Sequence, residues 1–279
     1  MSVSSAARSD FWSRKQAALV VAHPGHELRL HHWLELTQPV VFVLTDGSGH
    51  TGQSRLASTT GVLAAAAARP GSIYGRFTDA GLYTLMREGN PAPFVGLARE
   101  LAAALSSLEV GIVAGDALEG FNPSHDLCRY IINVAVSLMQ QDTQRAPENY
   151  DFLLDGDPGS RPQGAGGAVL VELDDAALQR KLAAAAGYPE LKAETAAALE
   201  RFGVGAFRTE CLRPVLDLRE GLDRLEIQPP AYERFGEMRV RDGYYDHVIR
   251  YRETVQPLVR ALWSESGVPK ARTKRPAIL

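Results

Sequence analysis

The hydrophobic residues of the chain fall into short unbroken runs that alternate with stretches of helical spacing. Runs of strand length lie at residues 17–22, 40–44, 72–77 and 110–114. Stretches with the apolar spacing of helices lie between and after them, at residues 26–36, 55–69, 94–108 and 127–139. Runs without polar alternation are typical of strands buried on both faces. This order of elements predicts an α/β fold, with a Rossmann-like, mostly parallel sheet flanked by helices.

The pattern changes after Pro147, where a C-terminal α/β elaboration is expected. Strands are predicted at residues 149–154 and 169–173, on either side of a connection rich in Gly and Pro, and helices at 178–186, 191–202 and 246–263. We therefore divide the chain into a lead-in (1–15), a core (16–155) and a C-terminal extension (156–279). Because its connection is short, the extension is expected to pack on the core.

Composition and charge narrow the classes of partner. The 279 residues are 45% hydrophobic and 23% charged with a net charge of -3, as in ordinary globular proteins, so neither a nucleic-acid nor a membrane partner is indicated. The basic cluster at 270–275 is a short tail. No segment approaches the roughly 20 apolar residues of a membrane helix, and no signal peptide is recognisable. With only two distant cysteines, a reducing compartment and a cytoplasmic location are predicted. The pattern does not indicate an oligomeric state.

Two histidines, His23 and His26, follow the first strand at its junction with a helix. In open α/β sheets, ligands bind in the crevice at the carboxyl ends of the strands. Two imidazoles at that position are a plausible beginning of a metal site. The alternative is two unrelated surface histidines beside a tight turn.

Polar residues also follow two other strands. Asp46 and His50 lie in the glycine-rich segment 45–52, and Asp116 opens the loop 115–126. The glycine-rich segment lacks the residue order that binds a phosphate chain, so a nucleotide site is rejected. We expect Asp46, His50 and Asp116 at the rim of the same crevice.

These motifs resemble those of the LmbE-like, PIG-L-type de-N-acetylases, which are zinc hydrolases that remove acetyl groups from amino sugars and related amides. The resemblance covers roughly residues 16–140. The segment Ala22-His23-Pro24-Gly25-His26-Glu27 stands where that family has Ala-His-Pro-Asp-Asp-Glu, and Asn122-Pro123-Ser124-His125 stands where it has His-Pro-Asp-His. Thr45-Asp46-Gly47, Arg55 and Asp79 look like the family's Thr-x-Gly loop, its arginine and its later aspartate.

The resemblance implies a metal ion held by His23, His26 and His125. His26 stands where an aspartate is usual, and imidazole is an equally good zinc ligand. The expected cofactor is Zn²⁺. Because a set of imidazoles does not select zinc strongly, another divalent transition metal such as Fe²⁺ is an alternative.

Two proton-handling residues of the family are absent. Gly25 replaces its general base and Asn122 replaces its second histidine, and neither a glycine nor an amide moves protons near neutral pH. Glu27 and Asp46 are the candidate bases, and Asn122 or Arg55 could stabilise an anionic intermediate. The alternative roles are stabilisation of a helix start by Glu27 and capping of its own loop by Asp46.

The sequence therefore predicts a metal-dependent hydrolase, similar to a de-N-acetylase, that acts on an amide or ester of a sugar-like small molecule. One alternative is an accessory protein of the same fold that binds a metal or a carbohydrate and has lost hydrolysis, which the changes at Gly25 and Asn122 favour. A second alternative is a different reaction at a three-histidine metal.

Overall fold

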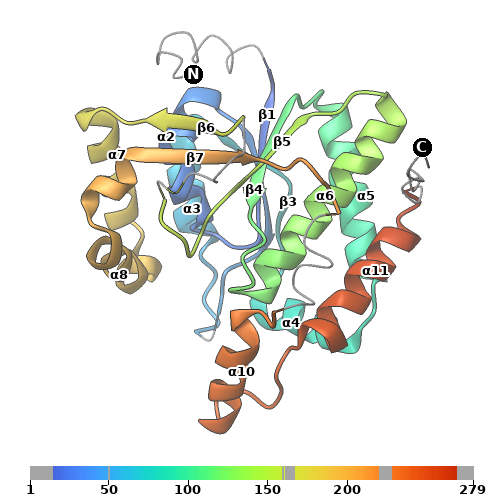
Figure 1. The fold of residues 1–279 in the computed structure, drawn as a ribbon. Helices are drawn as coiled ribbons and strands as arrows, with labels where there is room; N and C mark the ends of the chain where they lie inside the picture. Colours follow the sequence, from blue (N-terminus) through green and yellow to red (C-terminus); the bar gives the residue numbers. More distant parts are fainter. Residues whose placement is uncertain (1–14, 50, 159, 161–166, 220–227, 269–279) are drawn as a thin grey trace, which may run out of the picture.

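The computed structural model describes residues 15–49, 51–158, 160, 167–219 and 228–268. Its centre is a seven-stranded sheet with the strand order β3-β2-β1-β4-β5-β7-β6 (Figure 1). The strands are β1 (Ala17–Val21), β2 (Val40–Thr45), β3 (Arg69–Phe77), β4 (Ile112–Asp116), β5 (Glu148–Phe152), β6 (Val169–Glu172) and β7 (Thr209–Pro214). Nearly all of the predicted lead-in, the basic cluster at 270–275 and His50 lie outside the described residues.

The first five strands are parallel, and the last two are not. β1 pairs with β2 and β4, β2 with β3, and β4 with β5, all in parallel. β7 is antiparallel to β5 and to β6. The predicted fold class, a mostly parallel sheet with a C-terminal α/β elaboration, is confirmed.

Helices cover both faces of the sheet, which explains why β1 has no polar alternation. Ala18 and Val20 point into a core shared with α5, α6 and α11, whereas Leu19 and Val21 point into a second core shared with α2, α3 and α7 (Figure 1). The helices are η1 (His26–Leu30), α2 (His31–Thr37), α3 (Leu56–Ala65), α4 (Asp79–Glu88), α5 (Ala92–Ser107), α6 (Pro123–Thr143), α7 (Asp175–Ala186), η2 (Pro189–Leu191), α8 (Lys192–Phe202), η3 (Val204–Arg208), α10 (Ala231–Arg241), η4 (Tyr251–Val255) and α11 (Gln256–Glu265). Among the described residues, no helix is both long and apolar enough to span a membrane.

Three elements depart from the expected pattern. Strand β7 has no apolar run, because one of its buried residues is Glu210. The buried carboxylate is compensated by Lys181 of α7, which donates to it at 2.9 Å. Helix α10 shows little helical patterning because only Tyr232 and Gly236 of its residues are buried. The last helix begins at Tyr251 instead of near residue 246, since Arg250 has an extended backbone.

The Glu35 carboxylate joins α2 to α7 and makes the unfolding free energy depend on pH. Arg180 donates two hydrogen bonds to it, at 2.6 and 2.8 Å, and His32 lies 2.7 Å from it. The bonds from Arg180 lower the pKa of Glu35 to about 2, although partial burial opposes them. A lowered carboxyl pKa stabilises the fold above the unfolded-state pKa, and this contribution disappears as the pH falls from about 4.5 to about 2.

We expect the Glu35→Gln variant to lose less stability in acid than the wild type. Because Arg180 is half exposed, solvent screening reduces the difference to about 1 kcal/mol between pH 6 and pH 3. Urea unfolding at the two pH values measures it. The control is Glu109→Gln, which removes an exposed ion pair with Arg145 and should leave the acid loss unchanged. Equal acid losses in wild type and Glu35→Gln would contradict the assignment.

Candidate active site

The carboxyl ends of the parallel strands form the candidate site. β1 lies between β2 and β4, so the strand order runs outward from β1 to β2 and β3 on one side and to β4 and β5 on the other. In open α/β sheets, a ligand-binding crevice forms where the strand order reverses in this way. Loops and helix starts at this edge supply polar side chains from five places in the sequence. They are His23 and His26 after β1, Thr45 at the end of β2, Asp79 after β3, Asp116 at the end of β4, and Ser124 and His125 in the first turn of α6.

The structure brings His23, His26 and His125 together. Their ring centroids are 5.4 Å apart for His23 and His26, 5.1 Å for His23 and His125, and 4.5 Å for His26 and His125. His23 and His125 are both buried. Residues separated by about one hundred positions in the sequence therefore form one imidazole cluster.

Both ring nitrogens of His23 have protein partners. Nδ1 lies 2.7 Å from Thr45 Oγ1 and 3.0 Å from Asp79 Oδ1, and Nε2 lies 2.7 Å from Ser124 Oγ. Burial alone would raise the pKa of Asp79, but its hydrogen bond to His23 and the charge of that ring hold the pKa well below its usual range. Asp79 Oδ2 also accepts from the Gly49 N–H at 2.7 Å. The ionised carboxylate thus favours a proton on Nδ1 of His23, which leaves the lone pair on Nε2.

His26 forms a second imidazole–carboxylate pair. Its Nδ1 lies 3.0 and 3.1 Å from the two oxygens of Asp116. Asp116 is fully buried, and its Oδ2 accepts from the Ala22 N–H at 2.8 Å. Strand β4 therefore orients the ring of His26, just as the start of α4 orients that of His23.

The surroundings of His125 favour its neutral form. Burial, reinforced by the neighbouring His26 and His23, holds the pKa of His125 well below its usual value. Its buried Nδ1 has no hydrogen-bond partner among the residues that the structure describes. An unpartnered buried nitrogen is costly, so this atom is available to a ligand or a substrate group.

The chemistry of three imidazoles suits a metal ion, but their present arrangement does not fit one. Rings bound to one tetrahedral ion would have centroids roughly 5 Å apart, close to the observed spacing. However, both nitrogens of His23 and Nδ1 of His26 are directed at other protein atoms. Within the described part of the chain, no group of three or more His, Cys, Asp or Glu side chains is disposed to hold a metal ion. The binding of Zn²⁺ or Fe²⁺ stays a prediction of the sequence.

Gly25 has a structural reason to be a glycine. Its φ is +105°, in the region that disfavours side chains, and a Cβ there would overlap Cδ1 of Leu191 and approach Tyr188. The C-terminal extension thus occupies the space into which a base at position 25 would project.

The two carboxylates predicted as replacement bases have other contacts. Glu27 is fully buried, accepts from the Gly25 N–H at 2.7 Å and has a pKa raised by its burial. Asp46 accepts from the Ser48 N–H at 3.0 Å within its own loop. These contacts favour the structural alternatives, a turn held by Glu27 and a loop capped by Asp46.

Asn122 and Arg55 contact different parts of the site. Asn122 caps α6: its Oδ1 accepts from the Ser124 N–H at 2.9 Å, lies 2.6 Å from Ser124 Oγ, and accepts from the Tyr83 hydroxyl at 2.9 Å. The Arg55 side chain lies beside Gly47 and Gly49. Asn122 is therefore held by the helix start, and Arg55 lies against the glycine-rich loop.

Sequence reasoning gave Asp79 and Asp116 no orienting role, and it missed Ser124 and Tyr83. The two aspartates had a recognisable signal, because each follows a strand that ends at the crevice. Ser124 had a weaker one, its place between Asn122 and His125 in a motif otherwise assigned to the site. Only the fold shows that its hydroxyl meets His23.

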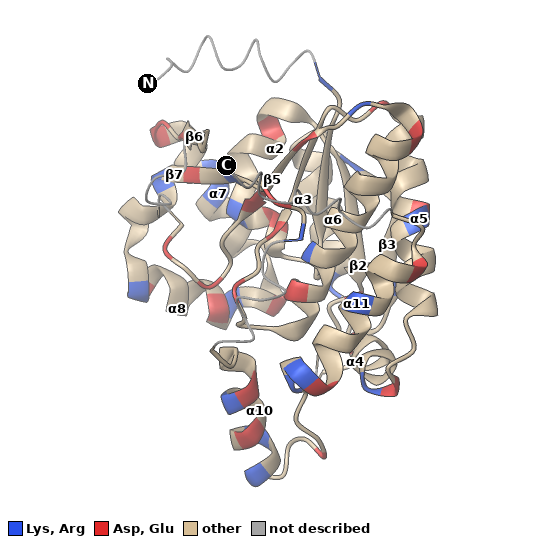
Figure 2. Cartoon of the chain, turned by 45° about the vertical axis from the view of Figure 1, so that its right-hand side comes forward, with Lys and Arg blue, Asp and Glu red and all other residues tan. Residues whose placement is uncertain are grey.

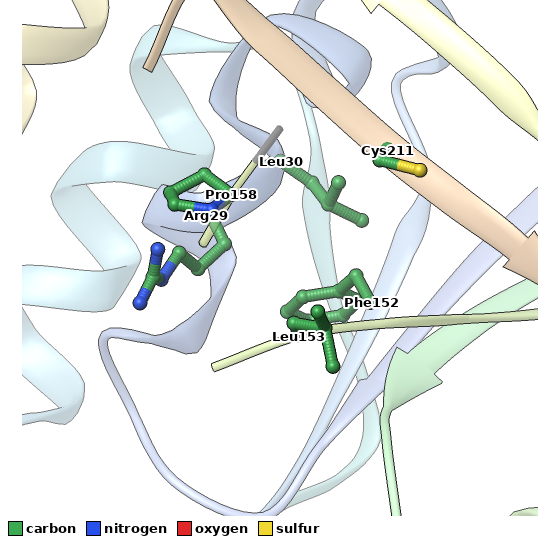
Figure 3. Close-up of a pocket in the computed structure, with 6 residues that line it drawn as sticks. All are labelled: Arg29, Leu30, Phe152, Leu153, Pro158 and Cys211. Atoms are coloured by element: carbon green, nitrogen blue, oxygen red, sulfur yellow. The ribbon is translucent and has the colours of Figure 1, made fainter. Parts of the chain in front are cut away.

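A pocket outside the imidazole cluster is shown in Figure 3. It is lined by Arg29, Leu30, Phe152, Leu153, Pro158 and Cys211. This lining has no histidine and no carboxylate, so the pocket lacks the groups that gather around His23. Charged residues of both signs are mixed along helices such as α10 (Figure 2).

Solved structures share this fold, although no protein-family profile and no curated protein sequence matches the chain. A deacetylase triple mutant from the teicoplanin biosynthetic pathway is 15% identical, with a TM-score of 0.52 over 71% of this chain and 97% of the other. The A40926 pseudoaglycone deacetylase Dbv21 is 17% identical, with a TM-score of 0.52 over 72% and 97% of the two chains. A deacetylase–bog complex from the teicoplanin biosynthetic pathway is 13% identical, with a TM-score of 0.52 over 72% of this chain and 97% of the other. At these identities the similarity shows a common fold.

Proposed function

We propose that the protein is a hydrolase of the LmbE-like, PIG-L-type de-N-acetylase class, which cleaves an amide or ester of a sugar-like small molecule. The observation that carries this proposal is the convergence of two imidazole–carboxylate pairs, His23 with Asp79 and His26 with Asp116, at the crevice of the sheet. The deacetylases of similar fold support the reaction class.

The two pairs divide the proton transfers that hydrolysis requires. The Nε2 lone pair of His23 can take a proton from the nucleophile that attacks the acyl carbon, while Asp79 stabilises the resulting imidazolium. His26, held by Asp116, can donate a proton to the departing nitrogen or oxygen. Cleavage of an amide needs this second proton transfer, because without it the nitrogen would have to depart as an anion, which is a poor leaving group.

The metal-dependent form of this hydrolysis needs a change at His23. The sequence resemblance supports Zn²⁺, or Fe²⁺, on His23, His26 and His125, but His23 Nε2 would first have to leave Ser124. Metal analysis of the purified protein before and after reconstitution tests this form. Less than about a tenth of an equivalent of bound transition metal would contradict it.

Release of acetate from N- and O-acetylated amino sugars tests the proposed reaction. We expect turnover of at least one of them, reduced at least about tenfold in His26→Ala. His247→Ala, which changes an exposed histidine, is the matched control and should keep full turnover. Binding of these sugars without release of acetate would contradict hydrolysis and support the accessory-protein alternative.

A further inference from the structure

We propose that a groove at the amino ends of β2 and β3 binds a small molecule with an apolar body and a single carboxylate. The groove has a volume of about 500 Å³ and lies between the first residues of these strands and the last two turns of α5. Cavities of this size commonly hold small ligands. The imidazole cluster lies at the opposite, carboxyl ends of the strands, so the inference goes beyond the proposed hydrolysis and does not depend on it.

An irregularity of strand pairing lies beside the groove. β3 is the edge strand of the sheet (Figure 1). Val41 is paired with Pro70 and Val43 with Tyr74, so the single residue Phe42 of β2 faces the three residues 71–73 of β3. Extra residues in one strand of a pair bend that strand away from regular pairing. The groove lies at this bend, with Phe42, Gly71 and Ser72 in its lining.

The floor of the groove is apolar. Val40 and Phe42 are almost completely buried, and the helix side is formed by Ala103, Ala104 and Leu108. At Gly71 a Cβ would lie only 2.4 Å from the ring of Phe42, so the backbone of β3 packs directly on this ring. Without a polar side chain, the floor suits the apolar body of a ligand.

The rim of the groove carries one uncompensated charge, and it is positive. Arg69 is exposed and has no ion pair among the residues that the structure describes. The other charged residue of the lining, Glu100, is compensated by Arg76, whose Nη2 lies 2.7 Å from its Oε1. A carboxylate matches a guanidinium in both charge and bidentate geometry. Charge complementarity therefore selects an anionic head group over a neutral or cationic one.

The end of α5 does not oppose a carboxylate strongly. Carbonyl groups at a helix end repel anions where they have no hydrogen-bond donor. Here the chain supplies one, since the Leu108 N–H donates to the Ala104 carbonyl at 3.0 Å. Ser107 at the end of the helix and Ser72 on the strand side also line the groove. Their hydroxyl groups can donate to the oxygens of a carboxylate.

Decanoate tests the site, with decanol as its uncharged match and decylamine as its cationic match. Titration calorimetry on the full chain measures the three affinities. A decanoate analogue that carries a photoreactive diazirine locates the binding site by peptide mass spectrometry. We expect saturable binding of decanoate, about fivefold weaker binding of decanol and still weaker binding of decylamine. The crosslinks should fall in residues 69–72 or 103–108.

Two variants test the head group and the body of the ligand separately. Arg69→Gln should lower the affinity for decanoate about fivefold and leave that for decanol unchanged, whereas Arg234→Gln, at an exposed position of α10, should change neither. Ala103→Phe fills the groove from an exposed helix position and should weaken both ligands at least about tenfold. Ala57→Phe, at an exposed position of α3, is its matched control.

Four outcomes would overturn the inference. They are tighter binding of decylamine than of decanoate, equal decanoate affinity in the wild type and Arg69→Gln, and crosslinks confined to another surface. The fourth is dimerisation in sedimentation experiments that Ala103→Phe abolishes, without binding of decanoate, which would assign the groove to a second copy of the chain. None of these measurements uses acetate release, so the proposed hydrolysis stands or fails separately.

Discussion

Replacing Asp79 by Asn is expected to lower the rate of acyl hydrolysis by about 10²–10⁴-fold. The carboxylate accepts two hydrogen bonds, one from His23 and one from the Gly49 N–H. An amide has one oxygen, so it can replace only one of these acceptors. With its oxygen on Gly49, the amide donates to His23 Nδ1 and places the ring proton on Nε2, where it blocks the base. Steady-state acetate release measures the loss.

The matched control for this prediction is Asp46→Asn. Asp46 lies in the adjoining loop, and its amide form can still accept from the Ser48 N–H, so its activity should stay close to wild type. The ring-nitrogen chemical shifts of His23 provide a second readout, because only Asp79→Asn should change its tautomer. Activity of Asp79→Asn within a few fold of wild type would show that the pair does not orient the base.

Restoring the family residue with Gly25→Asp is expected to destabilise the protein by about 2–5 kcal/mol without a gain in activity. Two costs contribute. A side chain at φ +105° strains the backbone, and its Cβ overlaps Leu191. The free energy of unfolding in urea measures the loss, and acetate release tests for any gain.

Two companion variants separate the costs at Gly25. Gly52→Asp places the same side chain at φ +71°, where no atom of the described residues lies within 4 Å of the new Cβ, so it should cost only the strain, about 1–2 kcal/mol. In the Leu191→Ala background, Gly25→Asp should no longer overlap residue 191. Its cost relative to Leu191→Ala alone should therefore be about 1–3 kcal/mol smaller than its cost in the wild type. A single Gly25→Asp variant with wild-type stability and faster turnover would mean that position 25 can still hold a base.

The variants at Asp79 and Gly25 together test which residue accepts the proton in this site. Leu191 and Tyr188 of the C-terminal extension lie over Gly25, the position that the sequence resemblance aligns with a base. Under the proposed function, the His23–Asp79 pair would accept the proton instead. Ser124 lies on the Nε2 atom that a metal ion on His23 would need, and metal analysis of the purified protein tests whether such an ion binds.

The sequence by itself determined the architecture and the place of the site. Unbroken apolar runs such as Leu19 to Ala22 need cover on both faces, and a strand followed by a helix in repeated order leads to a parallel sheet. Because parallel strands end at one edge, the polar residues after them were bound to meet there. These local patterns placed His23, His26 and Asp116 at that edge, whereas the inclusion of His125 came from the family resemblance of its motif.

Tertiary structure alone decided what the clustered side chains do. Hydrogen bonds between residues 22 to 101 positions apart direct the ring of His23 toward Thr45, Asp79 and Ser124, and no local pattern encodes which nitrogen meets which partner. The positive φ of Gly25 and the packing of Leu191 against it restrict which side chains position 25 can hold. Periodicity reports which face of an element is buried, whereas the chemistry of a site depends on distances of a few tenths of an ångström between elements, which are set only when the whole core packs.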